Sequence, residues 1–139
     1  MSAAGKPPEG MPMIRTIAMP ADANANGDIF GGWLMSQMDL AAGNLAVRAA
    51  HGRCVTVSVE AMSFIRPVKI GDEVTVYCEL LSTGRTSLNI AVEAWRRERS
   101  DEVDHQVTKA VFKFVAIDAE GRPRPVKPGQ ETVSKQPFE

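Results

Sequence analysis

The segment of this chain best suited to chemistry is a loop that leads into a helix, from Asn24 to Gly32. It ends in the pair Gly31-Gly32, and two glycines at a helix start let a ligand approach the backbone closely. The first amides of a helix have no partner within the helix and lie at the positive end of its dipole. They can therefore polarise a carbonyl or hold an oxyanion. The alternative is that the glycine pair only permits tight packing of the loop, with Asp28 capping nearby.

Asp39 places a carboxylate on the same helix, between Met38 and Leu40. A carboxylate on a largely buried helix is costly unless it is hydrogen-bonded or has a function, and such a group is suited to act as a general base. The alternative is that Asp39 faces solvent or bonds to a neighbouring chain. Asp39 lies about 12 Å beyond Gly31 along the helix. If both act on one reacting carbon, they are expected to come from different subunits.

Two arginine-containing segments could bind anions. The turn from Thr83 to Ser87 places Arg85 and two hydroxyl groups after a glycine, which is a combination that can bind phosphate. Arg66 stands at the end of a predicted strand, just before Pro67. Each segment also has an ordinary interpretation, as a hairpin turn with a solvated arginine and as a plain strand end.

The pattern of apolar residues predicts the elements that position these groups. Residues 31–50 form an apolar helix of about five turns that should be buried on most sides, with Gly52 as its left-handed stop. Period-two patterns then predict strands, and the connections between them are too short for crossover helices, so neighbouring strands should be antiparallel. The predicted strands cover residues 55–65, 74–80, 88–94 and 107–117, with a short one at 14–19.

The expected fold class is therefore α+β, with one long central helix wrapped by a five-stranded antiparallel sheet. A sheet that wraps one helix leaves its edges uncovered, so edge strands are expected to pair between subunits in a dimer-based oligomer. Residues 14–117 form the predicted domain, between a flexible N-terminal arm at 1–13 and a Pro-rich C-terminal tail at 118–139. No signal peptide or membrane span is recognisable, so a cytoplasmic location is expected.

Composition excludes several classes of function. The 139 residues carry a net charge of −1, which argues against a nucleic-acid partner because phosphate neutralisation needs excess Lys and Arg. Two Cys and two His are too few for a disulfide framework or a metal cluster, and Cys54 and Cys78 are expected to be buried thiols. A mechanism based on a carboxylate and backbone amides therefore fits the available residues better than a metal or histidine mechanism.

The glycine-containing loop and the spaced aspartate together resemble the signature of hotdog-fold acyl-CoA thioesterases, most closely the YciA type. The similarity continues through 50–53, 62–67 and 84–87 and covers about residues 14–125. The residues that carry the signature are Asn24, Gly27, Asp28, Gly31, Gly32 and Asp39.

This resemblance implies that the protein hydrolyses acyl-CoA thioesters to a carboxylic acid and CoA. Asp39 would be the general base or the nucleophile, Asn24 of the other subunit would orient the thioester or the water, and Gly32 with Gly31 would polarise the carbonyl. No metal or other cofactor is implied, since CoA enters as part of the substrate, and the assembly would be a trimer of dimers. The residues implied to contact substrate or CoA are Phe30, Gly31, Phe64, Arg66, Arg85, Thr86 and Ser87.

Two other functions are open to the same fold. A hydratase or dehydratase would be expected to use a histidine, but His51 and His105 both lie outside the glycine loop. A non-catalytic acyl-CoA-binding module would keep the phosphate-binding residues and would not need Asp39. The wall of the acyl pocket is expected among Trp33, Met35, Met38 and Leu45.

Overall fold

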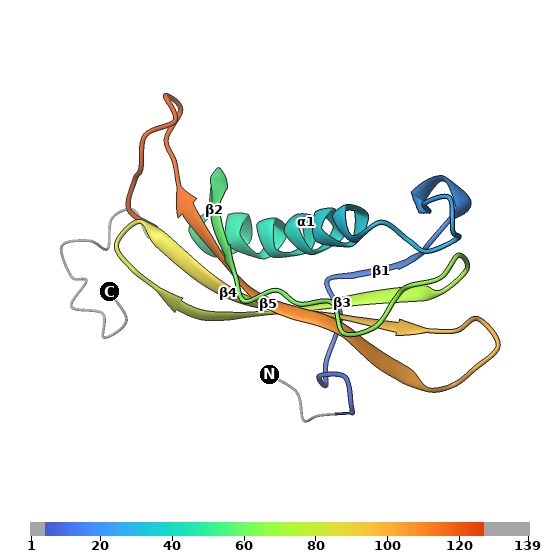
Figure 1. The fold of residues 1–139 in the computed structure, drawn as a ribbon. Helices are drawn as coiled ribbons and strands as arrows, with labels where there is room; N and C mark the ends of the chain where they lie inside the picture. The colour runs from blue at the N-terminus through green and yellow to red at the C-terminus, as the bar shows by residue number, and fades with distance from the viewer. Residues whose placement is uncertain (1–4, 127–139) are drawn as a thin grey trace.

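A long helix lies across one face of a curved antiparallel sheet (Figure 1). The computed structural model describes residues 5–126, so residues 1–4 of the predicted arm and residues 127–139 of the predicted tail lie outside the described residues. The helix, α1, spans Gly31–Ala50 as the sequence predicts. The other elements are β1 (Ile14–Ile17), a 3₁₀ turn (Pro20–Asp22), β2 (Cys54–Glu60), β3 (Glu73–Thr83), β4 (Ser87–Arg97) and β5 (Asp104–Ala116).

The strand order is β1-β3-β4-β5-β2, with every neighbouring pair antiparallel. The predicted antiparallel pairing is confirmed, but β2 pairs with β5 at the far edge and not with its sequence neighbour β3. The strand predicted for residues 55–65 also ends early, at Glu60, because Ala61 adopts a left-handed conformation with φ 58°. After this turn, residues 61–72 leave the sheet edge at β2 and connect to β3, which lies next to the opposite edge strand β1.

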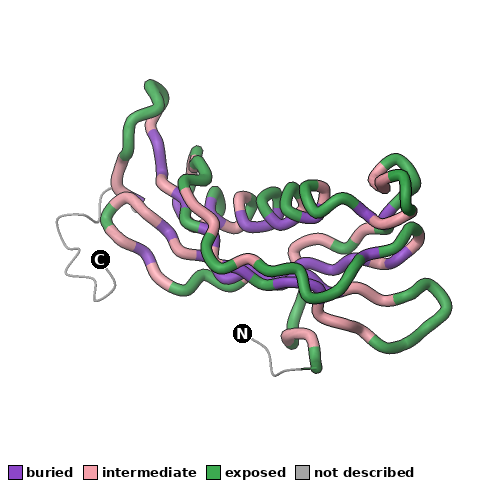
Figure 2. The backbone as a smooth tube through the Cα atoms, in the orientation of Figure 1, coloured by how far each residue is buried: buried purple, intermediate pink, exposed green. Residues whose placement is uncertain are grey.

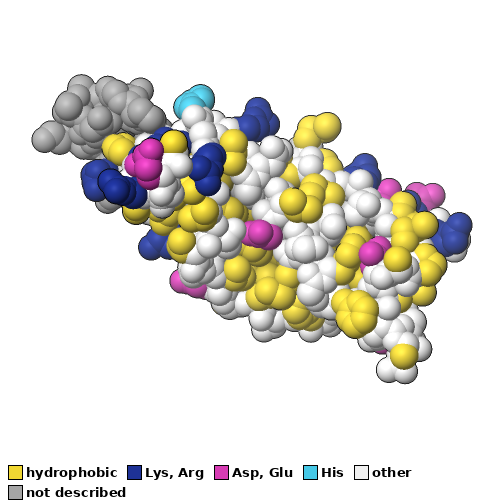
Figure 3. All heavy atoms as spheres, turned by 90° about the horizontal axis from the view of Figure 1, so that it is seen from above, with side chains coloured by type: hydrophobic (Ala, Val, Ile, Leu, Met, Phe, Trp, Pro, Cys, Tyr) yellow, Lys and Arg dark blue, Asp and Glu magenta, His cyan; other side chains and the backbone are white. Residues whose placement is uncertain are grey.

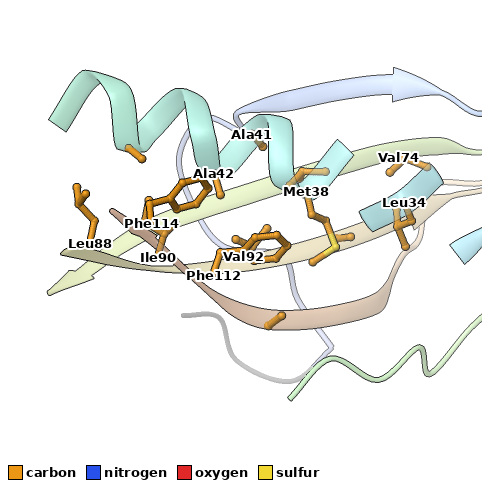
Figure 4. Packing of buried hydrophobic residues seen from close by; sticks show 14 of the residues in the cluster. Leu34, Met38, Ala41, Ala42, Val74, Leu88, Ile90, Val92, Phe112 and Phe114 are labelled. Carbon is orange, nitrogen blue, oxygen red and sulfur yellow. The ribbon is translucent and has the colours of Figure 1, made fainter. Parts of the chain in front are cut away.

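The core fills the space between α1 and the sheet. Alanines on the inner side of the helix let it approach the strands closely, while larger side chains fill the remaining gaps. Figure 4 shows Leu34 and Met38 pointing from the helix toward the sheet, with Phe112 of β5 beside Met38 and Phe114 of β5 farther along the helix, beside Ala42. This packing fixes the rotation of the helix and so determines which residues point away from the core.

The outer side of α1 is exposed in the single chain, contrary to the prediction that the helix is buried on most sides. Figure 2 shows burial confined to the side of the helix that faces the sheet. Leu40 is 63% exposed, and the neighbouring edge strand β2 exposes Val55 and Val57. From this side, hydrophobic side chains are spread over much of the surface (Figure 3). Exposed apolar area of this kind is typical of an interface.

The C-terminal end of α1 is capped differently from the prediction. His51, and not Gly52, is the left-handed residue, with φ 54°. Gly52 instead leaves room for a side chain: a Cβ there would lie 2.5 Å from the guanidinium of Arg124. The chain after residue 117, which the sequence places in a tail, thus returns to the helix end, and Val126 is buried. Among residues 5–126, no helix has the length and apolar character needed to cross a membrane.

Candidate active site

The start of α1 presents unpaired backbone donors. Phe30 is the N-cap residue and its side chain makes no capping hydrogen bond. Within residues 5–126, the amides of Gly31 and Gly32 have no hydrogen-bond acceptor, while the next two amides both donate to the Phe30 carbonyl. Both glycines are exposed. The predicted pair of free helix-start donors is therefore formed and open to a ligand.

The loop before the helix is held in shape by Asn24. Its Oδ1 accepts hydrogen bonds from the amides of Asn26 (2.9 Å) and Asp28 (3.1 Å). Its own amide donates to the Asp28 carbonyl at 2.7 Å, and the Asp28 carboxylate pairs with Lys69. Because the side-chain oxygen of Asn24 is used inside the loop, its NH₂ group is the part that remains for a substrate or a water molecule.

Asp39 is exposed and lies on the outer side of α1. The prediction of a buried carboxylate is therefore wrong for the single chain, because core packing turns Met38 inward and Asp39 outward. Asp39 Oδ1 accepts a hydrogen bond of 2.6 Å from Thr56 Oγ1 of β2. Sequence reasoning missed Thr56, since nothing in an alternating strand shows which of its polar residues will lie beside a given helix position.

A cavity of about 260 Å³ opens beside the helix start. It brings together four of the predicted contact residues, from the helix start and the segment after β2: Phe30, Gly31, Phe64 and Arg66. Arg66 is fixed there by a 2.7 Å hydrogen bond from its Nη1 to the Gln106 carbonyl. Of the side chains on the first helical turn, Leu34 lines the cavity. The four residues expected to form the acyl wall do not line it, and Met38 is in the core.

Arg85, Thr86 and Ser87 lie at the opposite end of the molecule. Their turn joins β3 to β4 and contacts residues 116 and 126, next to the end of α1. The full length of the helix, about 28 Å, separates this turn from the glycine loop. The structure therefore does not bring the two predicted CoA-binding groups together within one chain.

The thiols and imidazoles contribute no competing nucleophile or base at the cavity. Burial raises the pKa of Cys78 to about 12, and burial also raises the pKa of Cys54, with the nearby Arg124 opposing that rise. Both thiols therefore stay protonated and poorly nucleophilic at neutral pH. His51 caps the far end of α1 and His105 lies in β5, so neither lines the cavity.

Comparisons with known proteins identify the family of the chain. Residues 26–103 match the family model of the thioesterase superfamily. The acyl-CoA thioester hydrolase YciA of Escherichia coli (strain K12) is 51% identical over 127 residues, which cover 89% of this chain and 96% of that protein. A hexameric thioesterase from Yersinia pestis superposes with a TM-score of 0.82 at 48% identity, covering 88% of this chain and 99% of that one.

A more distant solved structure shares one feature of residue spacing with this chain. An acyl-CoA hydrolase from Staphylococcus aureus, solved with butyryl coenzyme A, has a TM-score of 0.76 at 27% identity and covers 82% of this chain and 70% of that one. Alanine variants of that enzyme have been solved for one asparagine and for one aspartate. The spacing of those two residues along its chain equals the spacing of Asn24 and Asp39 here. The chain belongs to the thioesterase superfamily, with the hotdog fold and the YciA-type resemblance that its sequence motifs predicted.

Proposed function

We propose that this protein is an acyl-CoA thioesterase, which hydrolyses acyl-CoA to a free carboxylic acid and CoA. The observation that carries the proposal is the pair of unpaired amides at Gly31 and Gly32, which open beside an apolar cavity. Backbone donors of this kind stabilise the oxyanion formed when a thioester carbonyl is attacked. The similarity to proteins named acyl-CoA thioester hydrolases supports the same reaction and substrate.

Asp39 supplies the second part of the chemistry. As a base it takes a proton from water while the water oxygen attacks the thioester carbon. The oxyanion then collapses, the C–S bond breaks, and the proton passes to the departing CoA thiolate. As a nucleophile it would instead form an acyl-enzyme anhydride that water cleaves. In both routes Thr56 holds the carboxylate in place, and the NH₂ group of Asn24 orients the thioester or the water.

The reacting groups come from different subunits in this proposal. Asp39 lies about 12 Å from the start of its own helix, too far to share a carbon with those amides. The exposed apolar side of α1 and the exposed edge of β2 support a homo-oligomer built from dimers. The hexameric state of the Yersinia pestis protein supports a trimer of dimers.

The substrate would extend between the two ends of the molecule. Phe30, Phe64 and Arg66 would contact the acyl and pantetheine part at the glycine loop. The phosphates would bind to Arg85, Thr86 and Ser87 of another subunit, because these residues lie at the far end of their own chain. CoA is part of the substrate, so the reaction as proposed uses no separate cofactor or metal. The cytoplasmic location stays a prediction from the sequence.

A thiol-release assay with acyl-CoAs of increasing chain length tests the function. The wild-type protein should release CoA, and Asp39→Asn should lower kcat by about 10²- to 10⁴-fold, as expected for loss of general acid–base catalysis. Glu102→Gln, which also removes one exposed carboxylate, is the control and should retain wild-type turnover. Acyl-CoA that binds tightly to the wild-type protein without release of thiol would instead identify a non-catalytic binding module.

A further inference from the structure

Residues 117–126 form a strap that runs back over the end of the domain. Asp118 closes a turn in which its Oδ1 accepts hydrogen bonds from the amides of Glu120 and Arg122, both at 2.9 Å. A bridge between Ile117 and Pro123 then aligns the returning chain with the end of β5. The strap ends at Val126, which is only 2% exposed. The strap is thus part of the packed domain.

Arg124 fastens the strap to the end of α1. Its guanidinium donates three hydrogen bonds of 3.0 Å, to the carbonyls of Ile117, Pro125 and Ala50. The bond to Ala50 satisfies a carbonyl in the last turn of the helix and places a positive charge at the negative end of the helix dipole. Gly52 leaves the space that the guanidinium occupies.

The same strap holds the turn that carries Arg85. The amide of Val126 donates to the Arg85 carbonyl at 2.8 Å, and the amide of Ala116 donates to the Thr86 carbonyl at 2.9 Å. Within the turn itself, the amide of Gly84 donates to the Ser87 carbonyl. Two of the three bonds at the turn therefore come from the strap and from the strand that leads into it, so the position of Arg85 depends on where the strap is fixed.

We infer that the strap, fastened by Arg124, is a positioning element for the phosphate-binding turn. It sets the affinity for the phosphate-bearing part of CoA and leaves cleavage of the thioester unaffected. This inference rests on the proposed function. Arg124 acts through Arg85 as a positioning residue, because Nε and both terminal nitrogens of its guanidinium each already donate to a backbone carbonyl.

The test compares two substrates that carry the same acyl group, one on CoA and one on pantetheine, which lacks the nucleotide and its phosphates. For Arg124→Ala we expect KM for acyl-CoA to rise about three- to tenfold, with kcat within about twofold of the wild-type value. KM for acyl-pantetheine should stay unchanged. Thermal unfolding and the oligomer size measured alongside show that the variant is folded.

Two further variants separate positioning from charge. Arg122→Ala removes the same charge two residues away, but the side chain of Arg122 is exposed and only its backbone takes part in the turn. It should leave both KM values unchanged. Arg124→Lys keeps the charge but loses the planar fork, and its KM for acyl-CoA should lie between those of the wild-type protein and Arg124→Ala. If Arg124→Ala fails to fold, the comparison of Arg124→Lys with Arg122→Ala serves as the test.

The inference is wrong if KM rises equally for both substrates, if it does not rise for either, or if Arg122→Ala has the same effect as Arg124→Ala. The last result would mean that the general positive field attracts the phosphates. Failure of the proposed function would look different, since the wild-type protein would then release no CoA from any acyl-CoA.

Discussion

The two ends of α1 are built in opposite ways. At the start of the helix, the amides of Gly31 and Gly32 have no acceptor within residues 5–126, and the N-cap residue Phe30 makes no capping bond. At the end, left-handed His51 and the Arg124 guanidinium both bond to carbonyls of the last turns. The chain therefore provides hydrogen-bond donors for carbonyls at one end of its longest element and leaves two amides at the other end open.

The two ends of the helix are therefore expected to have different roles, one in catalysis and the other in stability or CoA affinity. Unsatisfied backbone groups are costly where they are shielded from water, so an open end is stable only if it faces solvent or a ligand. The open end adjoins the cavity with Phe64 and Arg66, whereas the closed end adjoins the turn with Arg85. Variants at the open end should therefore change catalysis, and variants at the closed end should change stability or CoA affinity.

Among variants that compare the two helix ends, the largest effect is expected from Gly31→Pro, which removes one open amide. Proline is favoured at the first helical position, and Phe30 with ψ 135° already has the extended conformation that the residue before a proline adopts. The helix should persist while kcat falls about 10²- to 10³-fold, as expected for the loss of one oxyanion donor. Steady-state thiol release measures this.

The control for that variant is Gly31→Ala, which keeps the amide. Its Cβ would lie 3.5 Å from the Phe64 ring, an ordinary contact, so activity near that of the wild-type protein is expected. Equal losses of kcat in the two variants would show that the reaction depends on the absence of a side chain at residue 31, and not on its N–H group.

A smaller effect is expected from Thr56→Val, which removes the hydrogen bond to Asp39 at nearly constant volume. The carboxylate would keep its charge but lose its fixed orientation. We expect kcat to fall about tenfold, equivalent to one hydrogen bond to a charged group, with KM unchanged. Thr56→Ser keeps the donor and should recover most of the rate. No recovery by serine would mean that packing of the threonine methyl group is responsible.

At the closed end, Gly52→Ala should destabilise the protein without slowing catalysis. The added Cβ would lie 2.5 Å from Nη2 of Arg124, so the guanidinium would shift and lose its hydrogen bond to the Ala50 carbonyl, at a cost of about 1 kcal/mol. Chemical denaturation should show the lower free energy of unfolding, while kcat stays at the wild-type value. A large fall in kcat would contradict the separation between the two ends.

The smallest effect concerns Cys78, a thiol of β3 that does not line the cavity beside the helix start. Cys78→Ala should leave kcat unchanged at neutral pH. Because the pKa of this thiol is raised from 9.0 to about 12 by burial, the folded state holds its proton more tightly than the unfolded state between these values. The contribution of the thiol to stability is therefore complete below pH 9 and is lost as the pH rises from 9 toward 12. The difference in the free energy of unfolding between the wild-type protein and Cys78→Ala, measured by chemical denaturation across this pH range, isolates the contribution of the thiol.

The sequence predicts the helix boundaries and the antiparallel strands because periodicity reports local burial. Gly31–Ala50 is confirmed at both ends. Periodicity does not report which strand edges meet, so the pairing of β2 with β5 could not be predicted. The early end of β2 depends on the backbone of Ala61, whose left-handed conformation is unusual for alanine.

The candidate site is predicted in part for the same reason. Asn24, Gly31 and Gly32 are adjacent in sequence, so their local motif predicts their geometry. The outward direction of Asp39 and its contact with Thr56 depend on how the helix packs on the sheet, and the wall formed by Leu34 depends on the path of residues 61–68. These are tertiary relations between segments, which a single sequence does not contain.

The central claim is that one active site combines the open helix end of one chain with Asp39 of another. Mixing Gly31→Pro subunits with Asp39→Asn subunits tests it most directly, because each variant alone is nearly inactive. Reassembly from equal amounts should restore about a quarter of the wild-type activity, since half of the dimers are mixed and each mixed dimer has one intact site. Activity that stays at the level of the separate variants would contradict the account, because it would place both groups of each site in the same chain.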